Sequence, residues 1–319
     1  MKFIDVFNGD ADGICALHQL RLCKPLVSTL VTGVKRDITL LKKVEAARDD
    51  TITVLDISLE RNREALLAFL DKGTNVVYFD HHFAGEIPDD DRLEAYINMD
   101  ANICTSLLVN QYLNNKHLAW AVTGAFGDNL FVAAEQAAKP LDLSAEELEQ
   151  LKLLGTCLNY NGYGASIDDL IFPPQDLYNK IKPYANPFDF INYEPAYQLL
   201  VNGYHEDMAN AAASERVYET AHHAVVILEN EKWARRVSGV FANQLAQENP
   251  DRAHAMLTRN ENGGFVVSVR APLSNKTGAD ELCRQFHSGG GRKAAAGINH
   301  LPEAEYDQFM ATFLSAFID

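Results

Sequence analysis

The sequence lacks an excess of positive charge. Of its 319 residues, 28 are lysine or arginine and 44 are aspartate or glutamate, which gives a formal net charge of −16. A protein that binds long duplex nucleic acid regardless of sequence needs a basic surface, so we expect no long duplex partner. A short nucleotide held at its end remains compatible with this charge, because bound metal ions can supply the missing positive charge.

Long apolar runs and paired cysteines are also missing. No apolar stretch approaches the ~20 residues that a membrane helix needs. Asp5 and Asp10 interrupt the N-terminal segment where a signal peptide would have its apolar region. The five cysteines are scattered and none lies in a CxxC pair, so we expect reduced core thiols rather than zinc ligands or disulfides. We therefore expect a cytoplasmic protein without a membrane segment.

What the sequence does contain is an apolar strand that ends abruptly in metal-binding side chains. Residues 76–79 read Val-Val-Tyr-Phe, and Asp80, His81 and His82 follow directly. This pattern is typical of a buried strand whose last residues reach the edge of a sheet. In open α/β sheets the carboxyl ends of the strands are where ligands bind.

Two earlier apolar segments end in the same way. Residues 2–7 lead into Asn8-Gly9-Asp10-Ala11-Asp12, and residues 51–55 lead into Asp56. Each aspartate alone is explained equally well as a turn residue or a helix cap. Their repetition at one end of successive strands is what indicates a site. Asp128, which follows the apolar residues 118–126, resembles a fourth case, with a helix C-terminal turn residue as its alternative.

The order of patterns predicts an α/β fold with two domains. Strands that alternate with helices predict a doubly wound, mostly parallel sheet in the N-terminal domain, which we place at residues 1–200. Residues 159–204 are rich in Asn, Gly, Pro and Tyr and indicate the connection between domains. We expect a connecting helix over residues 201–223 and a smaller α/β domain with a mixed sheet over residues 224–319.

The C-terminal part carries a glycine-rich segment with two basic residues. Gly289-Gly290-Gly291 precede Arg292 and Lys293, and Arg270 follows an apolar strand shortly before them. A glycine loop can turn its amides toward an anion, and arginine can clamp a phosphate. The simpler alternatives are a glycine turn before a packed Ala-Ala-Ala segment and a surface arginine.

The predicted ligands outnumber what one metal ion requires. Carboxylates with imidazole suit Mn²⁺, with Mg²⁺ or Fe²⁺ as alternatives, better than a cysteine-rich zinc site. Two ions roughly 3.5–4 Å apart would use them all. The sequence therefore predicts a dinuclear site that contains five aspartates and two histidines: Asp10, Asp12, Asp56, Asp80, Asp128, His81 and His82.

These four motifs, in this order, resemble those of the DHH phosphoesterase superfamily. The segment over 289–297 resembles the signature of the DHH-associated C-terminal domain. The resemblance implies a manganese-dependent phosphoesterase with two domains and an active site in the cleft between them. It further implies that Asp10 binds one ion and that Asp56 bridges both. The ligands that it implies for the other ion are Asp12, His81 and Asp128.

The remaining roles also come from the resemblance. His82 would face the phosphate, and Asp80 would support the histidines. The substrate-binding residues would be Arg270, Gly289, Gly290, Gly291, Arg292 and Lys293.

Two positions depart from the family pattern. Many members have a metal-binding histidine four residues before the first aspartate, where this chain has Val6, so Asn8 is the nearest substitute ligand. The glycine segment commonly continues with histidine, where this chain has Arg292. Arginine stays charged and can clamp a phosphate, but it does not donate a proton at neutral pH.

Several substrates are compatible with the family. Its members include nano-RNases, adenosine 3′,5′-bisphosphate phosphatases, cyclic-dinucleotide phosphodiesterases, RecJ-type exonucleases and polyphosphatase relatives. The acidic chain without an added nucleic-acid module favours a short oligonucleotide or nucleotide. The alternatives are a catalytically weakened nucleotide-binding regulator, a polyphosphatase or RecJ-like exonuclease, and a purely structural α/β protein. A homodimer is the assembly to test first, because two-fold dimers are the commonest oligomers.

Overall fold

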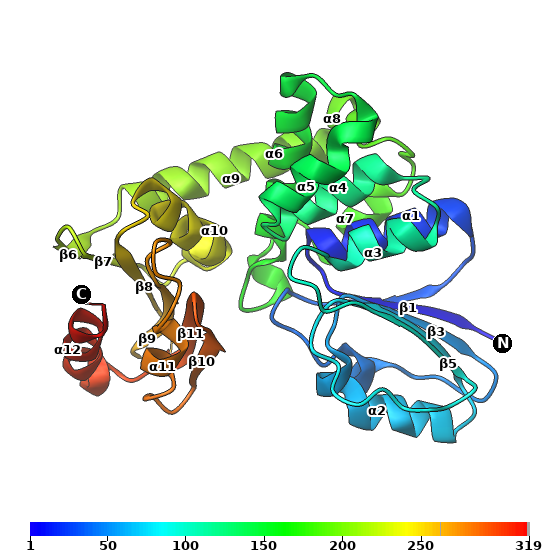
Figure 1. Ribbon diagram of the computed structural model, residues 1–319, viewed down its shortest axis with the longest axis horizontal. Coiled ribbons are helices and arrows are strands. Elements are labelled where there is room, and N and C mark those ends of the chain that lie inside the picture. Colours follow the sequence, from blue (N-terminus) through cyan, green and yellow to red (C-terminus); the bar gives the residue numbers. More distant parts are fainter. Residues whose placement is uncertain (262, 318–319) are drawn as a thin grey trace. The chain divides into compact units, whose positions relative to one another are not determined.

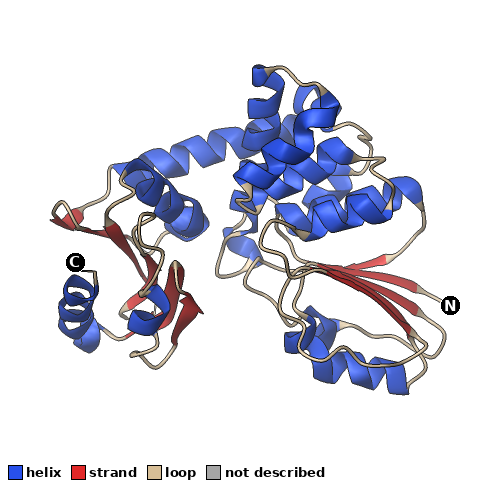
Figure 2. Cartoon of the chain, viewed as in Figure 1, coloured by secondary structure: helices blue, strands red, loops and turns tan. Residues whose placement is uncertain are grey.

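A computed structural model of the chain describes residues 1–261 and 263–317. Position 262 and the last two residues of the predicted C-terminal domain lie outside the described residues. The chain divides into two compact units, Met1–Gly203 and Tyr204–Asp319. Each unit contains one sheet flanked by helices (Figure 2).

The N-terminal unit is built on a five-stranded parallel sheet. Its strands are β1 (Phe3–Phe7), β2 (Thr29–Val31), β3 (Thr51–Leu55), β4 (Asn75–Asp80) and β5 (Leu93–Ile97), in the order β2-β1-β3-β4-β5. Each neighbouring pair is parallel. Because parallel strands all point the same way, the residues that follow β1, β3 and β4 meet at one edge of the sheet.

Helices cover both faces of this sheet. Helix α1 (Ala11–Cys23) follows β1 and packs with α3 (Thr105–Tyr112) on one face, whereas α2 (Leu59–Asp71) lies on the other face (Figure 1). The core beneath α2 contains Val6, Ile52 and Val76 from the sheet together with Leu66 and Phe69 from the helix. The arrangement buries alternate residues of the strands against α2 and the others against α1 and α3.

Further helices pack beyond α3 in this unit. They are α4 (Leu118–Gly127), α5 (Phe131–Ala138), α6 (Ala145–Gly162), α7 (Pro174–Ile181), α8 (Pro187–Tyr193) and the start of α9 (Pro195–Ala212). Helix α6 begins with a complete capping box between Ser144 and Glu147. Between β2 and β3 lies a short 3-10 helix, Leu40–Lys43.

The C-terminal unit is built on a six-stranded mixed sheet. Its strands are β6 (Arg216–Glu219), β7 (His223–Leu228), β8 (Ala253–Arg259), β9 (Phe265–Arg270), β10 (Gly289–Arg292) and β11 (Ala295–Leu301), in the order β10-β11-β9-β8-β7-β6. Strands β7 and β8 are parallel, and α10 (Lys232–Glu248) connects them. Helices α11 (Ala279–Cys283) and α12 (Tyr306–Ala316) add Leu282, Phe309 and Phe313 to the core.

The predicted fold class is confirmed. The chain is α/β, with a parallel sheet flanked on both faces and a smaller unit whose sheet is mixed. The expected connecting helix is only partly right, because α9 ends at Ala212 and residues 216–219 form strand β6. Among the described residues, none of the helices combines the length and apolar character that crossing a lipid bilayer requires.

Candidate metal centre

The turn after β1 places two aspartates of different function. Asp10 caps helix α1, where its Oδ1 accepts hydrogen bonds from the backbone amides of Asp12 and Gly13, both at 3.1 Å. Asp12 points toward the start of α3, and its two oxygens accept hydrogen bonds from the amides of Thr105 and Ser106, both at 2.7 Å. Both side chains are buried. The capping interpretation of Asp10 is therefore correct, and capping uses only Oδ1 of this carboxylate.

Asp56 is held in an unusual backbone conformation at the end of β3. Its φ of 59° lies in the left-handed region, which aspartate tolerates better than most residues. Its amide donates to the carbonyl of Phe79 at 3.0 Å, and its Oδ1 accepts a hydrogen bond from Thr105 Oγ1 at 3.1 Å. Such conformations often mark functional positions, because the surrounding structure must enforce them.

The tautomer of His81 follows from its hydrogen bond. The Nδ1 atom lies 3.0 Å from the carbonyl oxygen of Ile103, and a carbonyl only accepts, so Nδ1 donates. The opposite nitrogen, Nε2, then has a lone pair in the neutral ring. It lies 3.5 Å from Asp56 Oδ1 and 3.7 Å from Asp128 Oδ2. An imidazole lone pair directed at two carboxylates is the arrangement expected around a metal ion.

Asp80 forms a hydrogen bond with His82. Its Oδ1 lies 2.7 Å from His82 Nδ1, while its Oδ2 is buried without a hydrogen-bond partner among the described residues. Burial alone would lower the pKa of His82, but the Asp80 carboxylate more than offsets this and raises the pKa above its ordinary value. His82 keeps its Nε2 directed away from Asp80, and a third of its side chain is exposed.

Asp128 reaches the same place from a helix instead of a strand. It is the residue that ends α4, and it lies 3.7 Å from His81 through Oδ2 and 3.9 Å from Lys35 Nζ through Oδ1. Both interpretations of this residue hold, since it ends a helix and also faces the site.

Two groups of side chains are close enough to share an ion. The ligand atoms of Asp12, His81 and Asp128 lie within 4.8 Å of one another, and so do those of Asp56, His81 and His82. We call these five residues the His81 cluster. Oxygen ligands with imidazole nitrogen fit Mn²⁺. Asp10 and Asp80 lie outside both groups.

The negative charges of the cluster repel one another. Burial, and after it the surrounding carboxylates led by Asp12, raises the pKa of Asp56 well above its ordinary value. Burial also raises the pKa of Asp128 to about 6, against the opposing effect of the Lys35 ammonium. Crowded buried carboxylates with raised pKa values favour the binding of a cation.

Lys35 is the residue of this site that the sequence did not reveal. Its Nζ donates to Asp10 Oδ2 at 2.5 Å and to Asn159 Oδ1 at 2.8 Å. Burial alone would raise the pKa of Asp10, but the Lys35 ammonium lowers it below the ordinary value. We call Asp10, Lys35 and Asn159 the Lys35 cluster. A useful signal was present, since Lys35 follows β2 at the same edge of the sheet as the aspartates.

Asn8 and Val6 occupy different surroundings. Asn8 Nδ2 donates to the carbonyl of Lys35 at 3.4 Å, while its Oδ1 is buried without a partner among the described residues. Val6 is fully buried in the core beneath α2 and pairs with Val54 and Val31 of the adjacent strands. The place where the resemblance implies an ion bound by Asp10 therefore has no histidine. Asn8 remains a predicted ligand there.

The predicted substrate-binding residues of the C-terminal unit form a strand pair rather than a loop. Gly289–Arg292 are strand β10, which pairs antiparallel with β11 at the edge of the sheet. The loop prediction is wrong for these residues, because each glycine pairs with a residue of β11. An edge strand still leaves one side of its backbone unpaired with any other strand. Arg292 and Lys293, at its end, are exposed.

Close packing requires glycine at two of the three positions in this segment. A Cβ at Gly289 would lie 1.6 Å from the carbonyl oxygen of Cys283, and one at Gly291, where φ is 143°, would lie 2.5 Å from Ala296 Cα. A Cβ at Gly290 would meet no described atom within 4 Å. Packing thus explains two of the glycines and leaves Gly290 unexplained. Arg270, on β9, donates from Nε to Asn243 Oδ1 at 2.8 Å.

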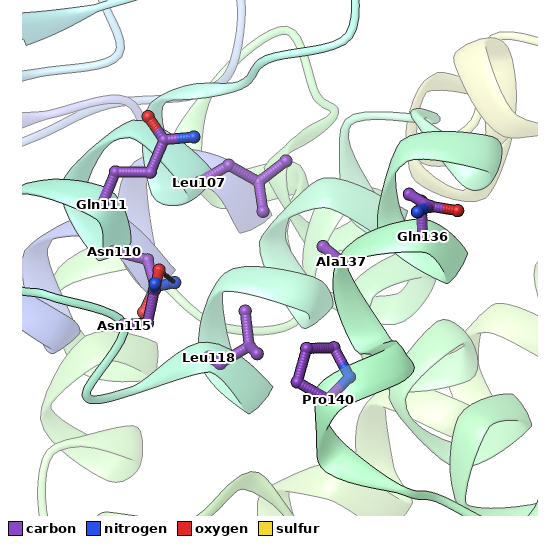
Figure 3. Close-up of a pocket in the computed structure, with 8 residues that line it drawn as sticks. All are labelled: Leu107, Asn110, Gln111, Asn115, Leu118, Gln136, Ala137 and Pro140. Carbon is purple, nitrogen blue, oxygen red and sulfur yellow. Dashed lines mark hydrogen bonds between the residues drawn. The ribbon is translucent and has the colours of Figure 1, made fainter.

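A pocket elsewhere in the N-terminal unit has a different character. It measures about 280 Å³ and lies between α3, α4 and α5 (Figure 3). Its lining includes Leu107, Gln111, Leu118 and Pro140, and no lining residue is charged or a histidine. It therefore has none of the carboxylates and histidines that make up the His81 cluster.

Solved structures share this fold. Over 98% of this chain, a manganese-bound exonuclease RecJ matches with a TM-score of 0.60 and 16% identity, covering 89% of the RecJ chain. RecJ from Thermus thermophilus, in complex with Mn²⁺, matches 98% of this chain with a TM-score of 0.61 and 16% identity. This chain spans about half of that protein, 51%.

A third similar structure is PggH from Vibrio cholerae, a pGpG-specific phosphodiesterase. It matches over 99% of this chain and 98% of its own, with a TM-score of 0.57 and 15% identity. No protein-family model and no curated protein matches the sequence. The predicted resemblance to DHH phosphoesterases is confirmed at the level of the fold.

Proposed function

We propose that this protein is a manganese-dependent phosphoesterase that hydrolyses an ester bond of a short oligonucleotide or nucleotide. The observation that carries the proposal is the His81 cluster, where carboxylates from β3, α1 and α4 surround one imidazole lone pair. The cluster stands at the carboxyl edge of a parallel sheet, where such folds bind ligands.

The residues present fit a metal ion. Asp12, His81 and Asp128 would hold it, and Asp56, whose Oδ1 lies 3.5 Å from His81 Nε2, is close enough to join them. A bound Mn²⁺ would polarise a phosphoryl oxygen and lower the pKa of a water molecule, so that hydroxide is available as the nucleophile toward phosphorus. The choice of manganese is supported by the two RecJ structures of similar fold, both of which contain that ion.

His82 would act on the substrate rather than on the metal. Its hydrogen bond to Asp80 fixes the ring, so Nε2 faces away from Asp80 and can reach a phosphate. The raised pKa favours the imidazolium, which can donate to a phosphate oxygen or to the leaving oxygen. Asp80 orients and charges this group.

The net charge and the C-terminal unit support the proposed substrate class. The net charge of −16 disfavours long strands, while the exposed Arg292 and Lys293 can bind the terminal phosphate of a short one. The PggH phosphodiesterase of similar fold is named for the dinucleotide pGpG, which is a substrate of this size.

The test is a substrate panel with purified protein and Mn²⁺. The panel contains dinucleotides, longer RNA and DNA, adenosine 3′,5′-bisphosphate, cyclic dinucleotides and polyphosphate, each with a chelator-treated control. We expect Mn²⁺-dependent cleavage of dinucleotides or of the bisphosphate in preference to long strands. Cleavage of no substrate, together with retained nucleotide binding, would overturn the enzyme proposal in favour of a nucleotide-binding regulator. Preference for long strands or polyphosphate would overturn the substrate class alone.

A further inference from the structure

The Lys35 cluster occupies the place where the resemblance implies the first of two ions. Lys35 Nζ lies 2.5 Å from Asp10, the residue expected to bind that ion, and 3.9 Å from Asp128. We infer that the Lys35 ammonium permanently replaces this ion, so that each chain binds one divalent cation. The inference rests on the proposed metal-dependent function and concerns how that site is built.

Both oxygens of Asp10 already accept hydrogen bonds, and the donor at Oδ2 is a cation. Its Oδ1 accepts from the amides of Asp12 and Gly13, and its Oδ2 accepts from Lys35. An ion at this carboxylate would have to displace the ammonium or lie within a few ångströms of it. Two cations at that spacing repel strongly in a buried site.

Lys35 is positioned by contacts from several elements. Its amide donates to the carbonyl of Gly162 at 2.8 Å, and its Nζ donates to Asn159 Oδ1, a neutral acceptor on α6. The ammonium also lies 5.5 Å from the centre of the Tyr163 ring. Only 22% of the side chain is exposed. A lysine held by an aspartate, an amide and an aromatic ring has the surroundings of a fixed cation, unlike a surface lysine.

The His81 cluster itself has ligands for one ion. The groups Asp12–His81–Asp128 and Asp56–His81–His82 share the residue His81. Because Nδ1 of His81 donates to Ile103, the ring has a single lone pair, on Nε2. One lone pair binds one ion. The two groups are therefore two possible sets of ligands for the same ion. Val6, buried where many DHH proteins have a histidine, removes the extra nitrogen that a second ion would need.

A lysine in place of an ion changes what the site needs. An ammonium is a compact charge that binds phosphate oxygens, and it does not dissociate when the metal concentration falls. The Lys35 ammonium then supplies the positive charge near the phosphate that a second metal ion would otherwise supply. We therefore expect metal activation to follow binding of a single ion without cooperativity.

The number of bound ions tests this inference. Isothermal titration calorimetry with Mn²⁺, checked by elemental analysis after gel filtration, gives the stoichiometry of the full chain. We expect one ion in the unmodified protein and two in Lys35→Met, because the neutral side chain of similar length frees Asp10 Oδ2. The control is Lys42→Met, which removes an exposed lysine paired with Glu64, and it should still bind one ion.

A direct view comes from anomalous scattering at the manganese edge in crystals grown with Mn²⁺. We expect one peak beside His81 Nε2 and none beside Asp10. Two ions in the unmodified protein would overturn the Lys35 inference and leave the proposed function standing. No bound ion would overturn the proposed function and the inference together. A single ion in both folded Lys35→Met and folded Lys35→His would show that Lys35 does not occupy the place of the ion expected beside Asp10. If neither variant folds, the stoichiometry and the anomalous peaks of the unmodified protein decide.

Discussion

The two units carry their candidate functional groups in opposite ways. In the N-terminal unit these groups are buried or partly buried and held by several elements at once: Asp12 by the amides of α3, Asp56 by Thr105, and His81 by the carbonyl of Ile103. In the C-terminal unit Arg292 and Lys293 stand exposed at the end of an edge strand.

The difference reflects what each kind of chemistry requires. Metal ligands must be fixed within a fraction of an ångström, and burial together with hydrogen bonds provides this. Phosphate contacts on an exposed strand act through long, mobile side chains and tune affinity. Loss of a buried ligand should therefore remove turnover, whereas loss of an exposed contact should weaken substrate binding alone.

The largest expected effect is that of Asp56→Asn. Asparagine keeps the tolerance for positive φ and the acceptor for Thr105, so the fold is retained while one carboxylate charge beside the metal is lost. We expect kcat with Mn²⁺ to fall at least about 10³-fold, since metal-centred stabilisation contributes several kcal/mol. The control is Glu64→Gln at an exposed carboxylate. Full activity of Asp56→Asn would contradict the role of the His81 cluster.

Next in size is the effect of Asp80→Asn. This variant shows whether Asp80 orients His82 or binds the metal ion. We expect kcat to fall about 10- to 100-fold, the usual effect of losing the group that orients a functional histidine. The Asp80 carboxylate raises the pKa of His82, so the imidazolium is lost as pH rises through that raised value. Without the carboxylate the pKa falls.

The alkaline decline of kcat/KM should therefore move to lower pH in Asp80→Asn, while the number of bound ions stays unchanged. A shift to higher pH would exclude His82 as the proton donor. Loss of the metal would instead place Asp80 among the ligands.

How far the sequence predicts this molecule differs between the two units. Asp10, Asp56 and Asp80 could be predicted to lie together, because each ends an apolar strand of a parallel sheet. Asp128 ends a helix, and only the coincidence with the other motifs and the family resemblance indicated it. Lys35 was missed because β2 has three residues with a partly exposed pattern, so a lysine beyond it looks like a surface charge.

Other misses have equally local causes. Strand β5 was not predicted because Leu93–Ile97 is a partly buried edge strand whose pattern gives a weak signal. The glycine segment was predicted as a loop since glycine disfavours strands. Its strand form depends on close packing against Cys283 and Ala296, which lies outside any local pattern.

A smaller effect is expected for Arg292→Ala in the C-terminal unit. The guanidinium is exposed at the end of an edge strand, so stability should stay within about 0.5 kcal/mol. We expect KM for a short oligonucleotide to rise about tenfold with kcat unchanged, as for the loss of one charged hydrogen bond. An unchanged KM would remove Arg292 from the binding surface. A fall in kcat alone would contradict the proposal that the N-terminal unit carries catalysis and the C-terminal unit carries substrate binding.

The smallest effect should come from Gly290→Ala, which can be compared with a substitution at Gly291 in the same strand. A Cβ at Gly290 has open space, so the free energy of unfolding should change by less than about 0.5 kcal/mol. If a substrate phosphate approaches the backbone there, the added methyl group should raise KM a few-fold. The matched variant Gly291→Ala should instead lose about 1–3 kcal/mol of stability, because φ is 143° and Ala296 lies in the way. Chemical denaturation and steady-state kinetics on both variants separate the outcomes. Unchanged KM in Gly290→Ala would mean that the glycine run serves only to pair β10 with β11.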